Sequence, residues 1–440
     1  MKFPNYKKKN VLILGLGLLG RGVKDAIFFA QKEANVTVTD LKTAEELKES
    51  LEKLKGYEIK YTLGEHKKAD ILNADLIIRN AGIPKDSKFL KLANQKKIKV
   101  EMDESLFAKY CPCPIIGITG TRGKTTTAFL IEKLLKDNLK GKNIYLAGNI
   151  QGEATLPLID KVTKNDLVVL ELSSWQLQGF EKNKISPHIA IFTNVYPDHL
   201  NTYKTMKEYI ADKKIIYQFQ KKTDYCIINK ENSYTNKLES EIPSNLIWFQ
   251  KKDVPKDIDT KLSGKHNIEN IAAVLAVANI LEIPQDKAIK SIQGFKGVPH
   301  RFEFVRNING INFINDTTST TPIAGQKALD SISSPIVLIA GGASKNLNLN
   351  ALAKAITKKV KAVILLEGTA TDELERKIKK NGGQNLIIGR FTDFKEAIEK
   401  AYSLALPNDT VLLSPGAASF GMFQNEFERG DQFKKIVTQL

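Results

Sequence analysis

The sequence predicts an α/β protein with three domains, and three observations support this prediction. The chain has 440 residues, which is the length of about three ordinary domains. Short apolar segments alternate with amphipathic segments of helical period along almost the whole chain, as in parallel β-sheets covered by helices. Proline-containing segments at residues 111–114 and 297–301 interrupt this alternation. We therefore expect domains at residues 1–112, 113–298 and 299–440.

The first domain is expected to be Rossmann-like. Its predicted strands lie at residues 11–14, 36–39 and 76–79. Gly15, Gly17 and Gly20 follow the first strand, where a dinucleotide-binding fold turns into its first helix, and Asp40 ends the second strand. This glycine motif is typical of a backbone that approaches a nucleotide closely. It occurs equally where a helix packs tightly on a strand, so both interpretations stay open at this point.

The second domain is expected to be a parallel sheet that binds a nucleotide phosphate. Its predicted strands lie at residues 115–118, 144–146, 167–170 and 189–192, with a buried helix at 266–281. The loop Gly120-Thr-Arg-Gly-Lys-Thr125 follows the first strand. Its glycines allow backbone N–H groups to point inward, the positive end of the next helix faces the same place, and Lys124 adds a full charge. Thr125 offers a hydroxyl to a magnesium ion.

This loop departs from the common nucleotide-binding pattern, because Ile118 stands where that pattern has its first glycine. The other interpretation is a glycine-rich turn with an exposed lysine. An apolar strand before the loop and three threonines after the lysine favour phosphate binding.

Two more candidate residues follow buried strands of the same domain. Glu171 comes directly after one strand, and His199 ends the segment 193–199 after the next. Ligands of parallel sheets bind at the carboxyl ends of the strands, and a carboxylate beside Thr125 and two phosphates suits a magnesium ion. A surface glutamate and a surface or capping histidine are the alternatives, and position in the sequence alone does not decide between them.

The third domain is expected to be a second Rossmann-like α/β unit. Its predicted strands lie at residues 311–314, 336–339, 363–366, 386–388 and 411–413. They alternate with segments of helical period, as in the other two domains.

Composition limits the classes of partner. The net charge of +17 is compatible with nucleic-acid binding, but the lysines are scattered and no basic stretch is interleaved with aromatic residues. We therefore expect no nucleic-acid partner. Three cysteines provide no paired framework, which favours a reducing cytoplasm, and no apolar stretch is long enough for membrane insertion.

The order of the motifs resembles that of the Mur ligases over essentially the whole chain. Any one motif can arise by chance, but the ordered set is specific. It comprises Gly15–Gly20, Gly120–Thr125, Gly148-Asn149, Glu171–Ser174, residues 193–199, Ala211-Asp-Lys213, residues 266–270, His300-Arg301, Asn315-Asp316, Gly341-Gly342 with Lys345, and residues 413–419.

The resemblance implies an ATP-dependent amide ligase of peptidoglycan precursor synthesis. Within the family, the chain is most similar to the branch that joins D-glutamate to UDP-N-acetylmuramoyl-L-alanine through an acyl phosphate. The first domain would hold the uridine nucleotide, the second ATP and the third the amino acid. The enzyme would be a monomer in the cytoplasm.

The resemblance also implies roles for individual residues. Substrate contacts are implied for Leu18, Leu19, Asp40, Asn80, Gly82, Asn149, Ser173, Thr320, Lys345 and Ser419. ATP contacts are implied for Gly120, Thr121, Arg122, Gly123, Lys124, Thr125, Thr126, Asn270, Arg301 and Asp316. Two magnesium ions would be held by Thr125, Glu171, His199 and a carbamylated Lys213. The implied catalytic residues are Lys124, Glu171, His199 and Lys213.

Three positions depart from the family pattern. Arg122 replaces the usual asparagine of the phosphate loop, Thr318 stands where many relatives have lysine, and Glu426 stands where an aromatic contact to the amino acid is usual. The Asp-Asn-Pro-Arg run that relatives use for diaminopimelate is missing, which favours glutamate. The alternatives are another Mur-family amino-acid ligase, a folylpolyglutamate-type synthetase, a dehydrogenase suggested by the first glycine turn, and a nucleic-acid-dependent ATPase suggested by the charge.

Overall fold

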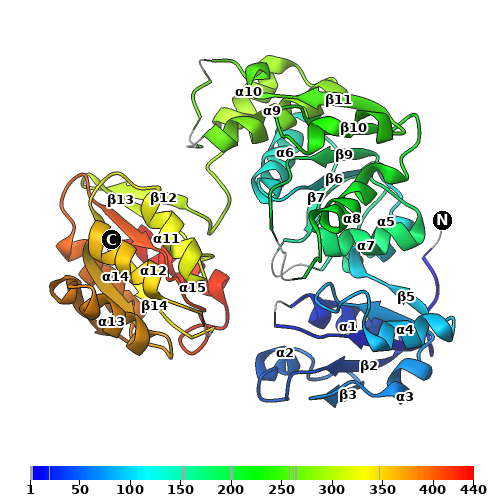
Figure 1. The fold of residues 1–440 in the computed structure, drawn as a ribbon, viewed down its shortest axis with the longest axis horizontal. Helices are drawn as coiled ribbons and strands as arrows, with labels where there is room; N and C mark the ends of the chain where they lie inside the picture. The colour runs from blue at the N-terminus through cyan, green and yellow to red at the C-terminus, as the bar shows by residue number, and fades with distance from the viewer. Residues whose placement is uncertain are drawn as a thin grey trace. The chain divides into compact units, whose positions relative to one another are not determined.

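The computed structural model describes residues 3–18, 20–150, 154–198, 202–256, 258–260, 262, 265–345 and 347–440, with the backbone alone at 265–266. The chain forms two compact units, Met1–Phe295 and Lys296–Leu440. The first unit contains two separate β-sheets and the second contains one (Figure 1). The three-domain α/β architecture is therefore confirmed, while the boundaries at 112 and 298 stay a prediction.

The first sheet has five parallel strands in the order β3-β2-β1-β4-β5. The strands are β1 (Asn10–Leu14), β2 (Asn35–Asp40), β3 (Ile59–Leu63), β4 (Leu76–Arg79) and β5 (Lys99–Glu101). The helices are α1 (Arg21–Gln31), α2 (Lys48–Glu52), α3 (Lys68–Leu72), α4 (Lys88–Gln95) and α5 (Asp103–Tyr110). Leu14 pairs with both Thr39 and Arg79, so the loops after β1, β2 and β4 leave the same edge. The strand order reverses between β1 and β4, which is where such sheets bind ligands.

The second sheet has six parallel strands in the order β11-β10-β9-β6-β8-β7. The strands are β6 (Ile115–Thr119), β7 (Ile144–Gly148), β8 (Leu167–Glu171), β9 (Ile189–Phe192), β10 (Tyr225–Asn229) and β11 (Asn245–Phe249). The helices are α6 (Lys124–Asn138), α7 (Ser174–Asn183), α8 (Met206–Gln218), α9 (Lys265–Ile280) and α10 (Gln285–Gln293), with short 3₁₀ turns η1 (Leu156–Asp160), η2 (Thr235–Lys237), η3 (Glu239–Glu241) and η4 (Lys251–Asp253). Ile118 pairs with Glu171 and Thr119 pairs with Phe192, so the ends of β6, β8 and β9 are neighbours.

The third sheet has six strands in the order β12-β13-β17-β14-β15-β16. The strands are β12 (Glu303–Ile308), β13 (Ile311–Asn315), β14 (Ile336–Gly341), β15 (Val360–Leu366), β16 (Ile387–Phe391) and β17 (Thr410–Leu413). The helices are α11 (Pro322–Asp330), α12 (Asn350–Lys359), α13 (Thr371–Lys380), α14 (Phe394–Leu404) and α15 (Glu426–Gln439), with the 3₁₀ turn η5 (Gln384–Leu386). β12 is antiparallel, so the sheet is mixed. Asn309 and Gly310, with φ of 50° and 82°, form the tight hairpin that reverses the chain before β13.

Every predicted strand is present, and the helix predicted at 266–281 is α9. Five strands were not predicted from the sequence, namely β3, β5, β10, β11 and β12. β5 has only three residues. β3 and β12 are partly exposed strands at the edges of their sheets, and their polar residues interrupt the apolar pattern by which a strand is predicted. In the described part of the chain, no helix is long and apolar enough to cross a membrane.

One apolar core is shared by the first two sheets. The same cluster of buried side chains contains Phe29 beneath the first sheet and Phe192 within the second, and Phe107 of α5 and Leu156 of η1 belong to it as well. This continuity explains why both sheets belong to a single compact unit.

Candidate active site

The loop between β6 and α6 is held in a conformation that needs glycine at two positions. Gly120 has φ of 149° and Gly123 has φ of 82°. A Cβ on Gly120 would lie 1.9 Å from the Thr193 hydroxyl oxygen, and one on Gly123 would lie 2.2 Å from Asn270 Oδ1. The loop is thus pressed between the segment after β9 and helix α9, which leaves no space for larger residues.

We expect Gly123→Ala to weaken ATP binding by more than about tenfold and to lower the melting temperature, since the left-handed backbone costs roughly 1–2 kcal/mol before any clash. Gly141→Ala is the matched control, because Gly141 has φ of 79° but nothing lies within 4 Å of its added Cβ. It should lose some stability and keep its affinity for ATP. Calorimetric ATP titration of both variants tests this, and equal affinities would contradict it.

The segment after β9 fixes the loop from the other side. Thr121 N donates to Asn194 O at 2.9 Å, and Arg122 N donates to Asn194 Oδ1 at 2.8 Å. Thr193 Oγ1 donates to Arg122 O at 2.7 Å. The Arg122 side chain itself is exposed. The predicted position of residues 193–198 beside the phosphate loop is therefore observed, whereas His199 lies outside the described residues.

Two lysine side chains converge on one carbonyl oxygen of the loop. Lys124 Nζ donates to Gly120 O at 3.0 Å, and Lys213 Nζ of α8 donates to the same oxygen at 2.9 Å. Lys213 is 1% exposed, and its Nζ lies 4.7 Å from the centroid of the Tyr209 ring. Lys213 seen alone in the sequence resembles a solvated lysine, but the fold buries it beside the loop.

Burial, followed by the nearby charge of Lys124, holds the pKa of Lys213 well below its usual range. Three nearby carboxyl groups act in the opposite direction and raise the pKa of Lys213, namely those of Asp198, Asp212 and Glu171. These carboxyl groups therefore lie near the same amine. A buried lysine with a depressed pKa is neutral over more of the physiological pH range, and a neutral amine can react with carbon dioxide.

Glu171 ends β8 and is 2% exposed. Its Oε1 accepts a hydrogen bond from Asn149 Nδ2 at 3.1 Å, while its buried Oε2 has no partner among the described residues. A buried carboxylate oxygen without a donor fits a cation ligand. Among the described residues, no group of three or more His, Cys, Asp or Glu side chains is arranged to hold a metal ion.

Asn270 lies directly against the loop. Its Oδ1 accepts from Thr127 Oγ1 at 3.4 Å, and its Nδ2 donates to Asn267 Oδ1 at 3.0 Å. Thr125 and Thr126 lie half-buried in the first turn of α6. Ser173 caps α7, where its Oγ accepts from Gln176 N at 3.3 Å.

The glycine turn of the first sheet is held by Asp40 and lies beside Asn80. The two carboxylate oxygens of Asp40 accept from Gly17 N and Lys42 N, both at 2.9 Å. Asn80 Oδ1 accepts from Gly82 N at 3.0 Å, and a Cβ on Gly15 would lie 3.0 Å from Asn80 Cβ. Four of the five residues predicted to bind the uridine nucleotide thus lie at the same edge of the first sheet, namely Leu18, Asp40, Asn80 and Gly82. Leu18 is 42% exposed there. The fifth, Leu19, lies outside the described residues.

In the second unit, Asp316 follows β13 and is 5% exposed. It accepts hydrogen bonds from Phe302 N at 3.0 Å, Ser414 Oγ at 2.9 Å and Ser319 Oγ. Burial raises the pKa of Asp316 to about 6. Arg301 is exposed, and Thr318, which replaces the lysine of many relatives, donates through Oγ1 to His300 O at 2.9 Å.

The predicted amino-acid site lies at the ends of β14 and β17. Lys345 Nζ donates to Thr320 Oγ1 at 2.8 Å. Ser419 is buried, and its Oγ has no hydrogen-bond partner within the described ranges. Glu426 contributes to the electrostatic environment of Lys345.

The sequence analysis missed Arg429, which is 0% exposed. Its Nε donates to Thr317 Oγ1 at 2.9 Å, its Nη2 donates to Thr317 O at 3.0 Å, and burial lowers its pKa to about 9. Its spacing of four and eight residues from Phe433 and Val437 places it on the apolar face of α15, a signal that could have identified it. A buried guanidinium next to Lys345 makes this end of the sheet suitable for an anion.

Comparison with known proteins identifies three family domains along the chain. Residues 9–101 match the Mur ligase MurD-like N-terminal domain, residues 118–254 the Mur ligase middle domain, and residues 300–416 the Mur ligase glutamate ligase domain. The chain is 38% identical to the UDP-N-acetylmuramoylalanine–D-glutamate ligase of Roseiflexus sp. (strain RS-1), with 98% of each chain covered. It is 35% identical to the ligase of the same name from Acetivibrio thermocellus, with 99% of this chain and 97% of that one covered.

Solved structures show the same fold at low sequence identity. UDP-N-acetylmuramate-alanine ligase MurC from Thermotoga maritima is 19% identical, with a TM-score of 0.58, and covers 98% of this chain and 99% of its own. MurF from Acinetobacter baumannii is 14% identical, with a TM-score of 0.57, and covers 92% of this chain and 91% of its own. By its sequence over the full length, the chain belongs to the Mur ligase family.

Proposed function

We propose that this enzyme uses ATP to join D-glutamate to UDP-N-acetylmuramoyl-L-alanine, a step of peptidoglycan precursor synthesis. The observation that carries the proposal is the convergence of Lys124 and Lys213 on Gly120 O, beside the buried carboxylate of Glu171. Such a concentration of charged groups at a glycine loop suits the transfer of a phosphoryl group. Relatives at 35–38% identity over the full length are named for this reaction.

The reaction would proceed in two steps. The carboxylate of the muramoyl-alanine substrate attacks the γ-phosphorus of ATP, forms a carbon–O–phosphorus linkage and releases ADP. The amine of D-glutamate then attacks the acyl carbon, loses a proton and releases inorganic phosphate as the amide forms. In both steps, Lys124 and the loop N–H groups would orient the phosphates and stabilise their charge.

Two magnesium ions would fit this site, with Thr125, Glu171, His199 and Lys213 as ligands. The unpartnered Glu171 Oε2 supports the assignment. When bound, magnesium neutralises part of the charge on the phosphates. The depressed pKa of the buried Lys213 supports carbamylation, because carbon dioxide adds to the neutral form of an amine and converts it into an anionic oxygen ligand.

The remaining predicted residues would bind the two other substrates. The turn held by Asp40, with Leu18, Leu19, Asn80 and Gly82, would bind the uridine nucleotide. Asn149 and Ser173 would lie near the reacting end of that substrate. Lys345, Thr320 and Ser419 would bind the side chain of D-glutamate, with Arg429 adding positive charge. Asn270, Arg301 and Asp316 would complete the ATP site.

The compartment and the oligomeric state stay proposals. The proposed substrates, ATP and a uridine nucleotide, and three free cysteines favour the cytoplasm. A monomer is proposed, which light scattering during size-exclusion chromatography would test.

The test is phosphate release by the purified protein with ATP, magnesium and UDP-N-acetylmuramoyl-L-alanine, measured with one amino acid at a time. We expect phosphate with D-glutamate and the background rate with L-glutamate, L-alanine and diaminopimelate. Phosphate release with UDP-N-acetylmuramate and L-alanine instead would assign the chain to another branch of the family. Phosphate release only with a folate and glutamate would assign it to the folylpolyglutamate-type synthetases.

A further inference from the structure

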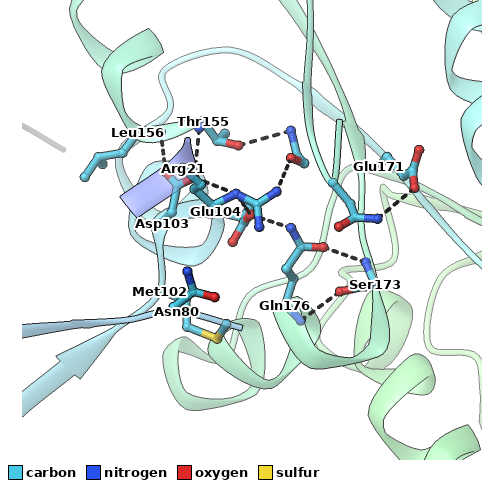
Figure 2. Close-up of polar contacts among 12 residues, drawn as sticks. Arg21, Asn80, Met102, Asp103, Glu104, Thr155, Leu156, Glu171, Ser173 and Gln176 are labelled. Atoms are coloured by element: carbon cyan, nitrogen blue, oxygen red, sulfur yellow. Dashed lines mark hydrogen bonds and ion pairs between the residues drawn. The ribbon is translucent and has the colours of Figure 1, made fainter. Parts of the chain in front are cut away.

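Arg21 links the first domain to the second, and no role has been assigned to it so far. It is the first residue of α1 and directly follows Gly20, the last glycine of the turn at the first sheet. Its side chain is only 18% exposed and reaches residues of the second sheet and of α5. Figure 2 shows Arg21 surrounded by Asp103, Glu104 and Thr155.

A cation at this place is electrostatically unfavourable for the helix itself. The first turn of α1 contains no acidic residue, and the positive end of a helix dipole repels a guanidinium. The contacts outside the helix compensate for this. Arg21 Nε lies 3.2 Å from Glu104 Oε1 and 3.7 Å from Asp103 Oδ2, and both carboxyl groups are buried. Arg21 is therefore held by its partners across the domain junction.

The first branch of the network leads from Arg21 to Glu171. Arg21 Nη2 donates to Gly148 O at 2.9 Å. Gly148 ends β7, where a Cβ would lie 2.1 Å from Glu171 O. The next residue, Asn149, donates through its backbone N to Glu171 O at 2.7 Å and through Nδ2 to Glu171 Oε1 at 3.1 Å. Arg21 thus fixes the short segment that orients the Glu171 carboxylate.

The second branch leads from Arg21 to the start of α7. Glu104 Oε1, the ion-pair partner of Arg21, accepts a hydrogen bond from Gln176 Nε2. Gln176 Oε1 in turn accepts from Ser173 N at 2.8 Å. Figure 2 shows this chain of contacts from Glu104 through Gln176 to Ser173. Two predicted site residues of the second domain, Glu171 and Ser173, are therefore both connected to one arginine of the first domain.

Asp103 adds a third connection. It accepts hydrogen bonds from Thr155 N and Leu156 N, and Thr155 Oγ1 accepts from Gly148 N at 3.1 Å. Gly148 and Thr155 are thus both held by groups that belong to, or contact, Arg21. Three buried acids, Asp25, Asp103 and Glu104, surround this one guanidinium, and burial raises the pKa of Asp103 to about 7. Removal of Arg21 would leave these acids without their counter-ion.

We propose that Arg21 is a positioning residue, which holds the Gly148-Asn149 segment and, through it, the Glu171 carboxylate in place relative to the glycine turn of the first domain. The inference rests on the proposed function, since it assumes that Glu171 holds magnesium and that the glycine turn holds the uridine nucleotide. It explains why an arginine follows the turn directly, where a small or acidic residue would suit the helix better.

The test compares Arg21→Gln, Arg21→Lys and a matched control, Lys32→Gln. Lys32 directly follows the last residue of the same helix and also crosses the junction, since its Nζ lies 2.7 Å from Asp160 Oδ1, but this pair contacts neither Gly148 nor Glu104 in the described structure. In Arg21→Gln, the magnesium concentration for half-maximal rate should rise about tenfold and kcat should fall by a similar factor, as is usual when a group that orients a metal ligand is removed. Arg21→Lys should restore part of the magnesium affinity and part of kcat, and Lys32→Gln should change neither quantity.

Hydrogen exchange provides a measurement that does not depend on activity. The amides of residues 144–150 should exchange faster in Arg21→Gln than in the wild type, while those of α6 should not change. Wild-type magnesium dependence together with wild-type exchange at 144–150 would overturn the inference, as would an equal shift in Lys32→Gln. If the wild-type protein forms no amide from D-glutamate, the proposed function fails, and the exchange comparison still decides whether Arg21 fixes this segment.

Discussion

Lys213→Ala is expected to lower kcat by about a thousandfold, because a metal ion contributes several kcal/mol of charge stabilisation and each 1.36 kcal/mol corresponds to about a factor of ten. The side chain is buried, and its Nζ lies beside the phosphate loop at 2.9 Å from Gly120 O. Alanine removes the amine that carbon dioxide would modify. Phosphate release with saturating substrates measures the loss.

The same variant tests the carbamate directly. Wild-type protein in ¹³C-bicarbonate should give a carbamate carbonyl resonance that is absent from Lys213→Ala. Lys214→Ala is the control, because the adjacent lysine forms a surface ion pair with Glu241 at 2.7 Å, and such pairs contribute about 0–1 kcal/mol. It should keep the resonance and the rate. A variant Lys213→Ala that keeps most of the wild-type rate would contradict the assignment of Lys213 as a ligand.

Lys124→Gln is expected to lower kcat/KM for ATP by about 10²–10³, the usual cost of removing one preorganised donor from a developing negative charge. The lysine begins α6, and its Nζ already lies over the loop, 3.0 Å from Gly120 O and 3.3 Å from Thr121 O. The glutamine side chain is shorter than that of lysine and carries no charge.

The pH dependence of the variant Lys124→Gln should also change. The charge of Lys124 contributes to the depressed pKa of Lys213, so its removal raises the pKa of Lys213. A smaller fraction of Lys213 is then neutral near pH 7, and the remaining activity should rise more steeply with pH than that of the wild type. Lys133→Gln, on the same helix and paired with Asp137 at 2.9 Å, should leave the pH profile unchanged. An unaltered profile in Lys124→Gln would show that the two lysines are not coupled.

The sequence predicted the parts of the fold that depend on short-range pattern. The central strands β1, β6, β8 and β14 consist almost entirely of apolar residues. Such runs are typical of parallel strands that are buried on both faces, so these strands could be predicted from the sequence. Edge strands such as β3 are partly solvated and lack this signal. Gly120 and Gly123 were found because a left-handed loop backbone favours glycine locally, whereas the close contacts with Thr193 and Asn270 that also require glycine are long-range.

The missed features depend on long-range packing. Lys213 and Lys214 are neighbours in one helix, yet one is buried at the loop and the other pairs with Glu241 near the surface. The helical period places Lys213 on the same face as Tyr209 and Ile216, but only the structure shows that this face lies against the phosphate loop. Arg21 and Arg429 are similar, because each donates a hydrogen bond to a group more than a hundred residues away in the chain. Family resemblance identified Lys213, but only the structure reveals the burial that holds its pKa below the usual range.

The apolar side chains common to the first two sheets bear on how this protein loses its structure. Phe107 and Leu156 each contribute to a single interior that extends under both sheets, so neither sheet retains a complete interior without the other. Unfolding of one sheet would expose apolar side chains of the other sheet to water. The two sheets should therefore unfold in a single cooperative transition. A fragment that begins near residue 113 would therefore expose this apolar surface to water and would tend to aggregate.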